Sequence, residues 1–220
     1  HYIPYTQTNA FSLLVYDYLE ENKGLQTYIE NFPNTESLRA QLALKSTQPL
    51  QRSILVEALR NQYAGIEMGE AVARNLDALQ STSTFTICTA HQPLIFTGHV
   101  YFIYKIVQTI LLAKHAKSLF PKKHFVPVFY IGSEDHDIDE IGHLVYNGKT
   151  YSWQPNQKGA CGRMSTSTLV RIATEIIASL DMQKEDEKWM IELLQESYNG
   201  TNTLAEATRI FVHALWKEEG

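Results

Sequence analysis

Cysteine is scarce in this sequence, since its 220 residues include only Cys88 and Cys161. Two thiols cannot form the disulfide framework that stabilises small secreted domains, so we expect a protein of a reducing compartment, the cytoplasm. Cys88 lies in a short apolar run and is expected to be a core thiol. Cys161 lies between Ala160 and Gly162 and is expected to be more exposed.

Long apolar runs, basic runs and an apolar leader are also missing. No stretch approaches the roughly 18 to 20 apolar residues that span a bilayer. Residues 1–5 have no basic segment followed by an apolar one, so we expect neither a signal peptide nor contact with a membrane. The 19 Lys and Arg are outnumbered by 24 Asp and Glu, which gives a net charge of −5 and argues against a nucleic-acid partner.

Helical periodicity is present at both ends of the chain. Apolar residues recur at helical spacing from Phe11 to Leu19, and shorter periodic runs follow. We therefore expect residues 1–80 to form a mostly helical N-terminal region and residues 154–220 to form a helical segment. Thr203 and Glu206 have the spacing of a capping box, which predicts the start of the last helix.

Residues 81–153 show a different pattern. After the polar cluster 81–84, β-branched and aromatic runs at 85–90 and 124–131 predict strands, and the apolar stretch 100–119 predicts a helix between them. The second run is apolar on both faces, which is typical of a buried strand. A strand, a helix and a second strand in this order indicate a parallel crossover and an α/β protein. Asn-Gly at 147–148 predicts a hairpin turn.

The loop after the first predicted strand is the first candidate site. It reads His91-Gln92-Pro93-Leu94-Ile95-Phe96-Thr97-Gly98-His99. Free backbone N–H groups at the following helix start favour an anion, Thr97 is expected to cap that helix, and Gly98 lets a ligand approach. We expect His91 and Gln92 to point into the same crevice. The spacing is neither a dinucleotide fingerprint nor a P-loop, and a capped helix without a ligand is the alternative.

The loop after the second predicted strand concentrates negative charge. It holds five acids and one histidine within seven residues, namely Glu134, Asp135, His136, Asp137, Asp139 and Glu140. Repulsion between carboxylates raises their pKa values unless solvent or a cation offsets it. A solvated loop is one alternative. The other is a metal site with His136, Asp137, Asp139, Glu140 and His143 as possible ligands, although the spacing of His136 and His143 is not that of a zinc-binding helix. Lys105, two turns into the helix, either reaches back toward the crevice or is an ordinary surface lysine.

Together the two loops resemble those of the bacillithiol biosynthesis cysteine-adding enzyme family, most strongly over residues 86–143. The resemblance rests on His91-Gln92-Pro93-x-x-Phe96-Thr97-Gly98-x-x-Tyr101-x-x-Tyr104-Lys105, Pro127-Val128-Phe129 and Glu134-Asp135-His136-Asp137-x-Asp139-Glu140-Ile141. It implies a Rossmann-like parallel sheet core, incomplete in this chain, that is expected to continue beyond residue 220. Full-length members carry a C-terminal coiled coil, which implies a homodimer.

The function implied by the resemblance is that of a ligase. It would join the carboxyl of cysteine to the amine of glucosaminyl-malate and so complete bacillithiol. The resemblance leaves open whether ATP activates the carboxyl, and no metal is expected. The alternatives are a metal-dependent hydrolase that uses the acidic histidine cluster, and a non-catalytic module that binds a nucleotide or a sugar.

The resemblance also assigns roles to residues of both loops. The expected catalytic residues are Asp135, His136 and Asp137, and the expected substrate-binding residues are His91, Gln92, Thr97, Gly98, Lys105 and Glu134. An amine must lose a proton before it attacks a carboxyl, so Asp135 or His136 is expected to be the base. These roles require both loops to open into one crevice at the same edge of a parallel sheet.

Overall fold

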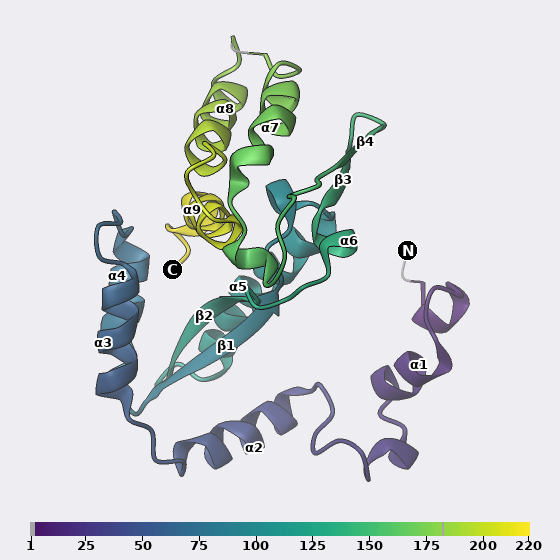
Figure 1. Ribbon diagram of the computed structural model, residues 1–220. Coiled ribbons are helices and arrows are strands. Elements are labelled where there is room, and N and C mark those ends of the chain that lie inside the picture. The colour runs from purple at the N-terminus through teal and green to yellow at the C-terminus, as the bar shows by residue number, and fades with distance from the viewer. Residues whose placement is uncertain (1–2, 182) are drawn as a thin grey trace. The chain divides into compact units, whose positions relative to one another are not determined.

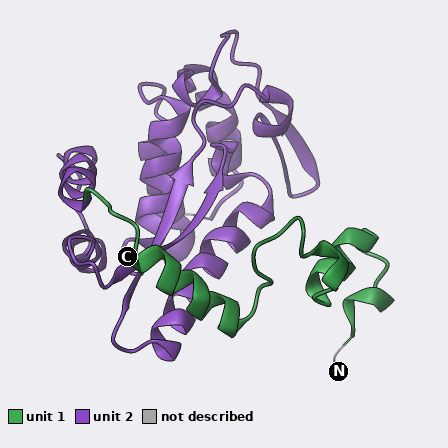
Figure 2. Ribbon diagram, turned by 90° about the horizontal axis from the view of Figure 1, so that it is seen from below, with its two compact units in different colours: residues 1–51 green, residues 52–220 purple. Residues whose placement is uncertain are grey.

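The computed structural model describes residues 3–181 and 183–220, whose helices and strands are labelled in Figure 1. His1, Tyr2 and Met182, which fall within the expected N-terminal region and C-terminal segment, lie outside the described residues. The chain divides into two compact units, residues 1–51 and 52–220, which Figure 2 colours separately. The predicted α/β class is confirmed, and the division into regions 1–80, 81–153 and 154–220 stays a prediction.

The first unit consists of short helices and turns. Its elements are the 3-10 turns Tyr5–Gln7 and Lys23–Leu25 and the helices α1 (Leu13–Leu19) and α2 (Thr35–Ser46). Helix α2 begins where the Asn34 side chain accepts a hydrogen bond from the Ser37 N–H. Among its described residues, 3–51, only Leu42 is buried, so this part of the unit has no apolar core of its own.

The second unit begins with two helices that pack against each other, α3 (Arg52–Gln62) and α4 (Glu70–Ala78). Their inner faces bury Val56 and Leu76 against Val126 of the sheet. The first strand then begins at the end of the polar cluster 81–84, which confirms the predicted change of structure there.

A parallel pair of strands joined by a long helix forms the centre of this unit. These elements are β1 (Thr84–His91), α5 (Val100–Leu119) and β2 (His124–Ile131). The register pairs Thr84 with His124 and His91 with Ile131, so the two strands end at the same level. Helix α5 packs against both strands, as Figure 1 shows. The crossover predicted from the sequence is confirmed.

Strand β2 is less buried than its apolar sequence predicts. Phe125 and Val126 are buried, but Tyr130 is 57% exposed. The sheet contains only β1 and β2 among the described residues, so each strand has a free edge. A cavity of about 550 Å³ follows β2 along residues 126–131, between helices α3, α4, α5 and α9. The expectation that Cys88 is a core thiol is wrong, since its side chain is exposed, together with those of Thr86 and Ala90 on the same face of β1.

The remaining elements build a second apolar cluster. They are α6 (Ile138–Ile141), β3 (His143–Tyr146), β4 (Lys149–Ser152), the 3-10 turns Cys161–Arg163 and Thr166–Thr168, α7 (Val170–Ile177), α8 (Glu185–Ser197) and α9 (Leu204–Trp216). Asn147 and Gly148 both have positive φ in the turn of the predicted hairpin. The predicted capping box at Thr203 and Glu206 is present. None of the helices in the described part of the chain combines the length and apolarity needed to cross a bilayer.

Candidate functional site

The two polar loops leave the sheet side by side at the carboxyl ends of β1 and β2. The Gly132 N–H donates to the His91 carbonyl at 2.8 Å, which extends the parallel pairing one residue beyond β2. Further out, Gln92 Nε2 donates to Glu140 Oε2 at 2.9 Å and joins the first loop to the second. The expectation that both loops lie at one edge of a parallel sheet is therefore confirmed, and a crevice shared by the two loops stays a prediction.

Glu140 connects three elements at this edge. Its Oε2 accepts from Gln92, and its Oε1 accepts from the Tyr101 hydroxyl of α5 at 3.2 Å. Burial, and after it the Glu140 carboxylate, raises the pKa of Tyr101, so the phenol stays protonated and able to donate. Glu140 stands in the acidic motif, but the sequence indicated no catalytic or substrate-binding role for it, because both of its partners are about 40 or more residues away.

Aromatic and imidazole rings pack beside this carboxylate. The His99 ring stacks on Tyr101 with centroids 5.4 Å apart, and the His91 ring lies 5.1 Å from Tyr101 on another side. The His143 ring meets His99 edge to face at 5.1 Å. The sequence pattern did not indicate this stack, because no spacing rule relates the loop after β1 to a strand that follows α6.

His91 is the most buried member of the group, with 8% of its surface exposed. Burial lowers its pKa, and a hydrogen bond to the Gln92 carbonyl only partly offsets that effect. Since the carbonyl of Gln92 accepts, His91 Nδ1 carries the proton of that 3.1 Å contact, which leaves Nε2 as an acceptor. At neutral pH His91 is therefore a neutral imidazole.

The lowered pKa of His91 predicts a loss of stability in acid. An unfolded chain binds the proton more readily than the folded one, so the free energy of unfolding falls as the pH drops below the ordinary histidine value of 6.5. We expect the thermal midpoint of the full-length protein to fall between pH 7.5 and 5.5. The fall should be smaller in His91→Gln than in the wild type, and equal falls would contradict this account of His91.

Lys105 reaches back from α5 to the end of β1. Its Nζ donates to the Ala90 carbonyl at 2.7 Å, one residue before His91. Its positive charge also lowers the pKa of His91, although less than burial does. Of the two alternatives for this lysine, the structure supports the one in which it reaches back to the end of β1.

The acidic side chains of the second loop hold backbone groups and do not converge on one point. Asp135 Oδ1 accepts from the Asp137 N–H at 2.8 Å, and Asp137 Oδ1 accepts from the Glu140 N–H at 3.0 Å. Glu134 is exposed and, among the described residues, accepts a hydrogen bond only from the Tyr130 hydroxyl, at 3.5 Å. Among residues 3–181 and 183–220, no group of three or more His, Cys, Asp or Glu side chains is placed to hold a metal ion.

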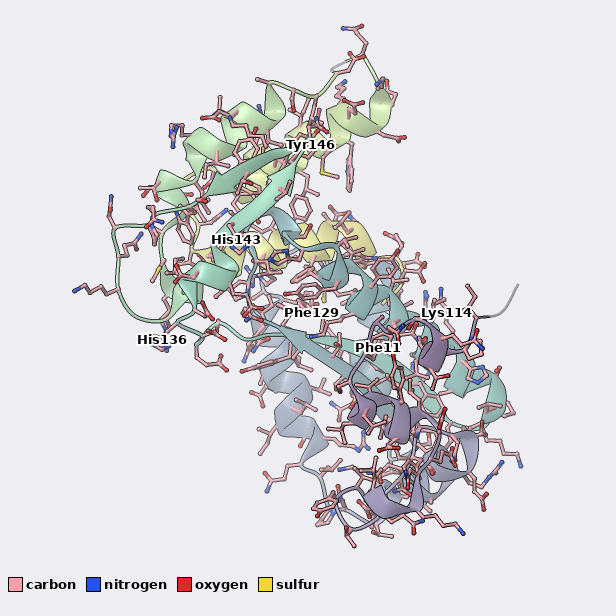
Figure 3. All side chains as sticks on the ribbon, turned by 90° about the vertical axis from the view of Figure 1, so that its right-hand side faces the viewer. Phe11, Lys114, Phe129, His136, His143 and Tyr146 are labelled. Atoms are coloured by element: carbon pink, nitrogen blue, oxygen red, sulfur yellow. The ribbon has the colours of Figure 1, made fainter. Side chains whose placement is uncertain are left out.

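His136 lies on the outside of the same loop. Its side chain is exposed and has no hydrogen-bond or ring partner among the described residues, and Figure 3 shows it apart from His143. The structure thus brings Gln92 and Lys105 to the strand ends beside His91, and leaves His136 free to meet a substrate from solvent. None of the nine expected site residues lines the cavity along β2.

A strained turn in the first loop carries Thr97 and Gly98. Phe96, Thr97 and Gly98 have φ values of 51°, 60° and 24°. A left-handed backbone costs a residue with a β-carbon about 1–3 kcal/mol. The expectation that Thr97 caps α5 is wrong, because this turn ends two residues before the helix and leaves His99 at the N-cap without a capping side chain. Both Thr97 and Gly98 are half-buried.

A segment that the sequence left unassigned supports the second loop. The Cys161 N–H donates to the Asp135 carbonyl at 2.7 Å, and the Gly162 N–H donates to the Ser133 carbonyl at 3.0 Å. Because these contacts enclose it, Cys161 is fully buried, and the expectation of an exposed thiol is wrong. Burial, followed by the nearby Asp135 and Asp137 carboxylates, raises the pKa of the thiol, so Cys161 is an unreactive packing residue.

Comparison with known proteins identifies one family over the whole chain. The family model described as "Bacillithiol biosynthesis BshC, N-terminal Rossmann-like domain" matches residues 1–220. The relative named "Putative cysteine ligase BshC" in Flavobacterium psychrophilum is 38% identical over 99% of this chain and 41% of its own length. A relative of the same name in Cytophaga hutchinsonii is 37% identical over 97% of this chain and 39% of its own length. The chain thus spans about two fifths of the length of these curated relatives.

Proposed function

Since this chain belongs to the BshC family of bacillithiol biosynthesis, as its Rossmann-like N-terminal domain, we propose that the full-length protein is a ligase that joins cysteine to glucosaminyl-malate through an amide bond. The relatives are named as cysteine ligases, and the second substrate is the part of the proposal that goes beyond their names.

The observation that supports this proposal is the hydrogen bond between Gln92 and Glu140, which holds the two loops together. In parallel α/β folds, substrates bind beyond the carboxyl ends of the strands, where such loops meet. The Lys105 ammonium, at the end of β1, would attract a negatively charged group such as malate. The acidic loop that follows β2 would attract an amine.

Amide formation requires a base and an activated carboxyl. We assign the base to His136, because its free, exposed imidazole can take the proton that the amine of glucosaminyl-malate loses as it attacks the cysteine carboxyl. Asp135 is assigned to orient that part of the loop, since its carboxylate holds the Asp137 N–H. As the C–N bond forms, one carboxyl oxygen must leave, either as water or, where ATP activates the carboxyl, with the departing phosphate of the nucleotide.

Replacing His136 or Asp135 in the full-length protein tests these roles. His136→Ala is expected to lower product formation from cysteine and glucosaminyl-malate about 100-fold or more, since general acid–base groups contribute roughly 10²- to 10⁴-fold. Asp135→Asn is expected to lower it less, because the amide oxygen can still accept from the Asp137 N–H. The product is measured by mass spectrometry with and without ATP.

Asp186→Asn provides the control, because it removes a carboxylate from the exposed first turn of α8, on a different element. It should leave product formation unchanged, while circular dichroism shows that all three variants are folded. Full turnover in His136→Ala would contradict the assignment of the base. Absence of the amide product in the wild type, with and without ATP, would contradict the proposed function itself.

A further inference from the structure

Tyr198 contacts the strained turn of the first loop from inside the protein. It lies at the C-terminal end of α8 and is 2% exposed. The Phe96 N–H donates to its hydroxyl at 2.8 Å, and the two rings lie with centroids 4.2 Å apart. These partners are 102 residues apart in the sequence, so the helical C-terminal segment reaches the loop that carries Thr97 and Gly98.

The hydrogen bond matters because of the backbone that it holds. Phe96 and Thr97 are left-handed, a conformation that residues with a β-carbon keep only when their surroundings fix it. In this conformation the Phe96 N–H is directed at a buried group, where a donor without a partner would be unfavourable. The Tyr198 hydroxyl supplies that partner, and burial keeps it protonated by raising its pKa above the ordinary range.

The turn directly follows a buried part of the first loop. Leu94 and Ile95, just before it, are fully buried, and the Gly98 N–H donates to the Ile95 carbonyl at 2.8 Å. After these residues, the direction of the chain depends on the conformation of Phe96. A change at Phe96 would therefore move Thr97 and Gly98 relative to Gln92, which Glu140 holds separately.

We propose that Tyr198 is a positioning residue of the ligase site, whose hydroxyl keeps Phe96 left-handed and so fixes Thr97 and Gly98 for binding glucosaminyl-malate. The kinetic part of this inference rests on the proposed function. The structural part does not, because the hydrogen bond can be tested without any substrate.

Tyr198→Phe in the full-length protein separates the hydroxyl from the ring, which keeps its contact with Phe96. We expect faster hydrogen exchange in a peptide that covers residues 94–98, by about 5- to 10-fold, because one buried hydrogen bond is lost. The KM for glucosaminyl-malate should rise by a similar factor, and kcat should change less. A purely structural role would lower the amount of folded enzyme without raising KM.

Tyr151→Phe is the matched control. Tyr151 belongs to the same apolar cluster and is also buried, but its hydroxyl neighbours Lys149 and not the turn. This variant should leave both the exchange of residues 94–98 and the KM as in the wild type.

Each of three outcomes would overturn either the proposed role of Tyr198 or the proposed ligase function. Unchanged exchange of residues 94–98 in Tyr198→Phe overturns the inference whatever the activity. Faster exchange with an unchanged KM would show that the Tyr198 hydroxyl holds the turn without affecting substrate binding, and this result also overturns the inference. If the wild type forms no amide product, the proposed function fails, and the exchange comparison alone then decides whether Tyr198 holds the turn.

Discussion

Gly162→Ala is expected to destabilise the protein and to displace the acidic loop. A β-carbon at residue 162 would lie 2.5–2.6 Å from the Cα, Cβ and carbonyl oxygen of Ser133, so the backbone of one segment must move. Overpacking of this kind costs about 1–3 kcal/mol. The movement would also break the support of Asp135 by the Cys161 N–H. We expect a thermal midpoint several degrees lower and product formation reduced about tenfold or more.

Gly132→Ala is the control for this substitution, because it adds the same methyl group to the loop that Gly162 supports. Its β-carbon would meet the nearest atoms of His91 and Gln92 at 3.6–3.7 Å, which is ordinary van der Waals contact. The thermal midpoint of Gly132→Ala should therefore stay close to that of the wild type. Equal midpoints for the Gly162 variant and the wild type would show that the two segments do not pack as described.

Glu140→Gln is expected to produce the second large effect, this time on activity. The carboxylate accepts from both Gln92 and Tyr101, and a hydrogen bond to a charged group contributes about 1.5–3 kcal/mol. Glu140 is half-buried and Tyr101 is partly exposed, so solvent reduces that contribution. We expect kcat/KM for glucosaminyl-malate to fall roughly 10- to 100-fold, since each 1.4 kcal/mol is tenfold.

The neutral amide in Glu140→Gln keeps the size of the side chain, so the loss reports the charge and the second hydrogen bond. Glu192→Gln makes the same change on the exposed face of α8 and should leave kcat/KM as in the wild type. If both variants retain full activity, Glu140 does not organise the site.

The sequence predicted the elements whose signals are local. The crossover 84–131 was predicted because β-branched runs and a 20-residue apolar helix alternate within it. The turn at Asn147 and the capping box at Thr203 were predicted for the same reason, since each depends on residues at most three apart. That both loops share one sheet edge followed from the parallel crossover.

The contacts that complete the site could not be predicted, because they join distant parts of the chain. The close approach of Gly162 to Ser133 and the hydrogen bond from Phe96 to Tyr198 have no sequence signature. The capping role expected for Thr97 was wrong because tertiary contacts hold its backbone in a left-handed turn that β-branched residues rarely adopt. The burial of Cys161 could not be predicted either, because it depends on the hydrogen bond from the Cys161 N–H to the Asp135 carbonyl, which also has no sequence signature.

A double-mutant cycle between Gln92 and Glu140 tests most directly whether the two loops form one substrate site. Calorimetry would give the Kd for glucosaminyl-malate of the full-length wild type, Gln92→Ala, Glu140→Ala and the double variant. We predict that each single substitution weakens binding and that the double variant binds about as weakly as the worse single one, because the two side chains act through one hydrogen bond. Losses that simply add, or single variants that bind as tightly as the wild type, would contradict the account.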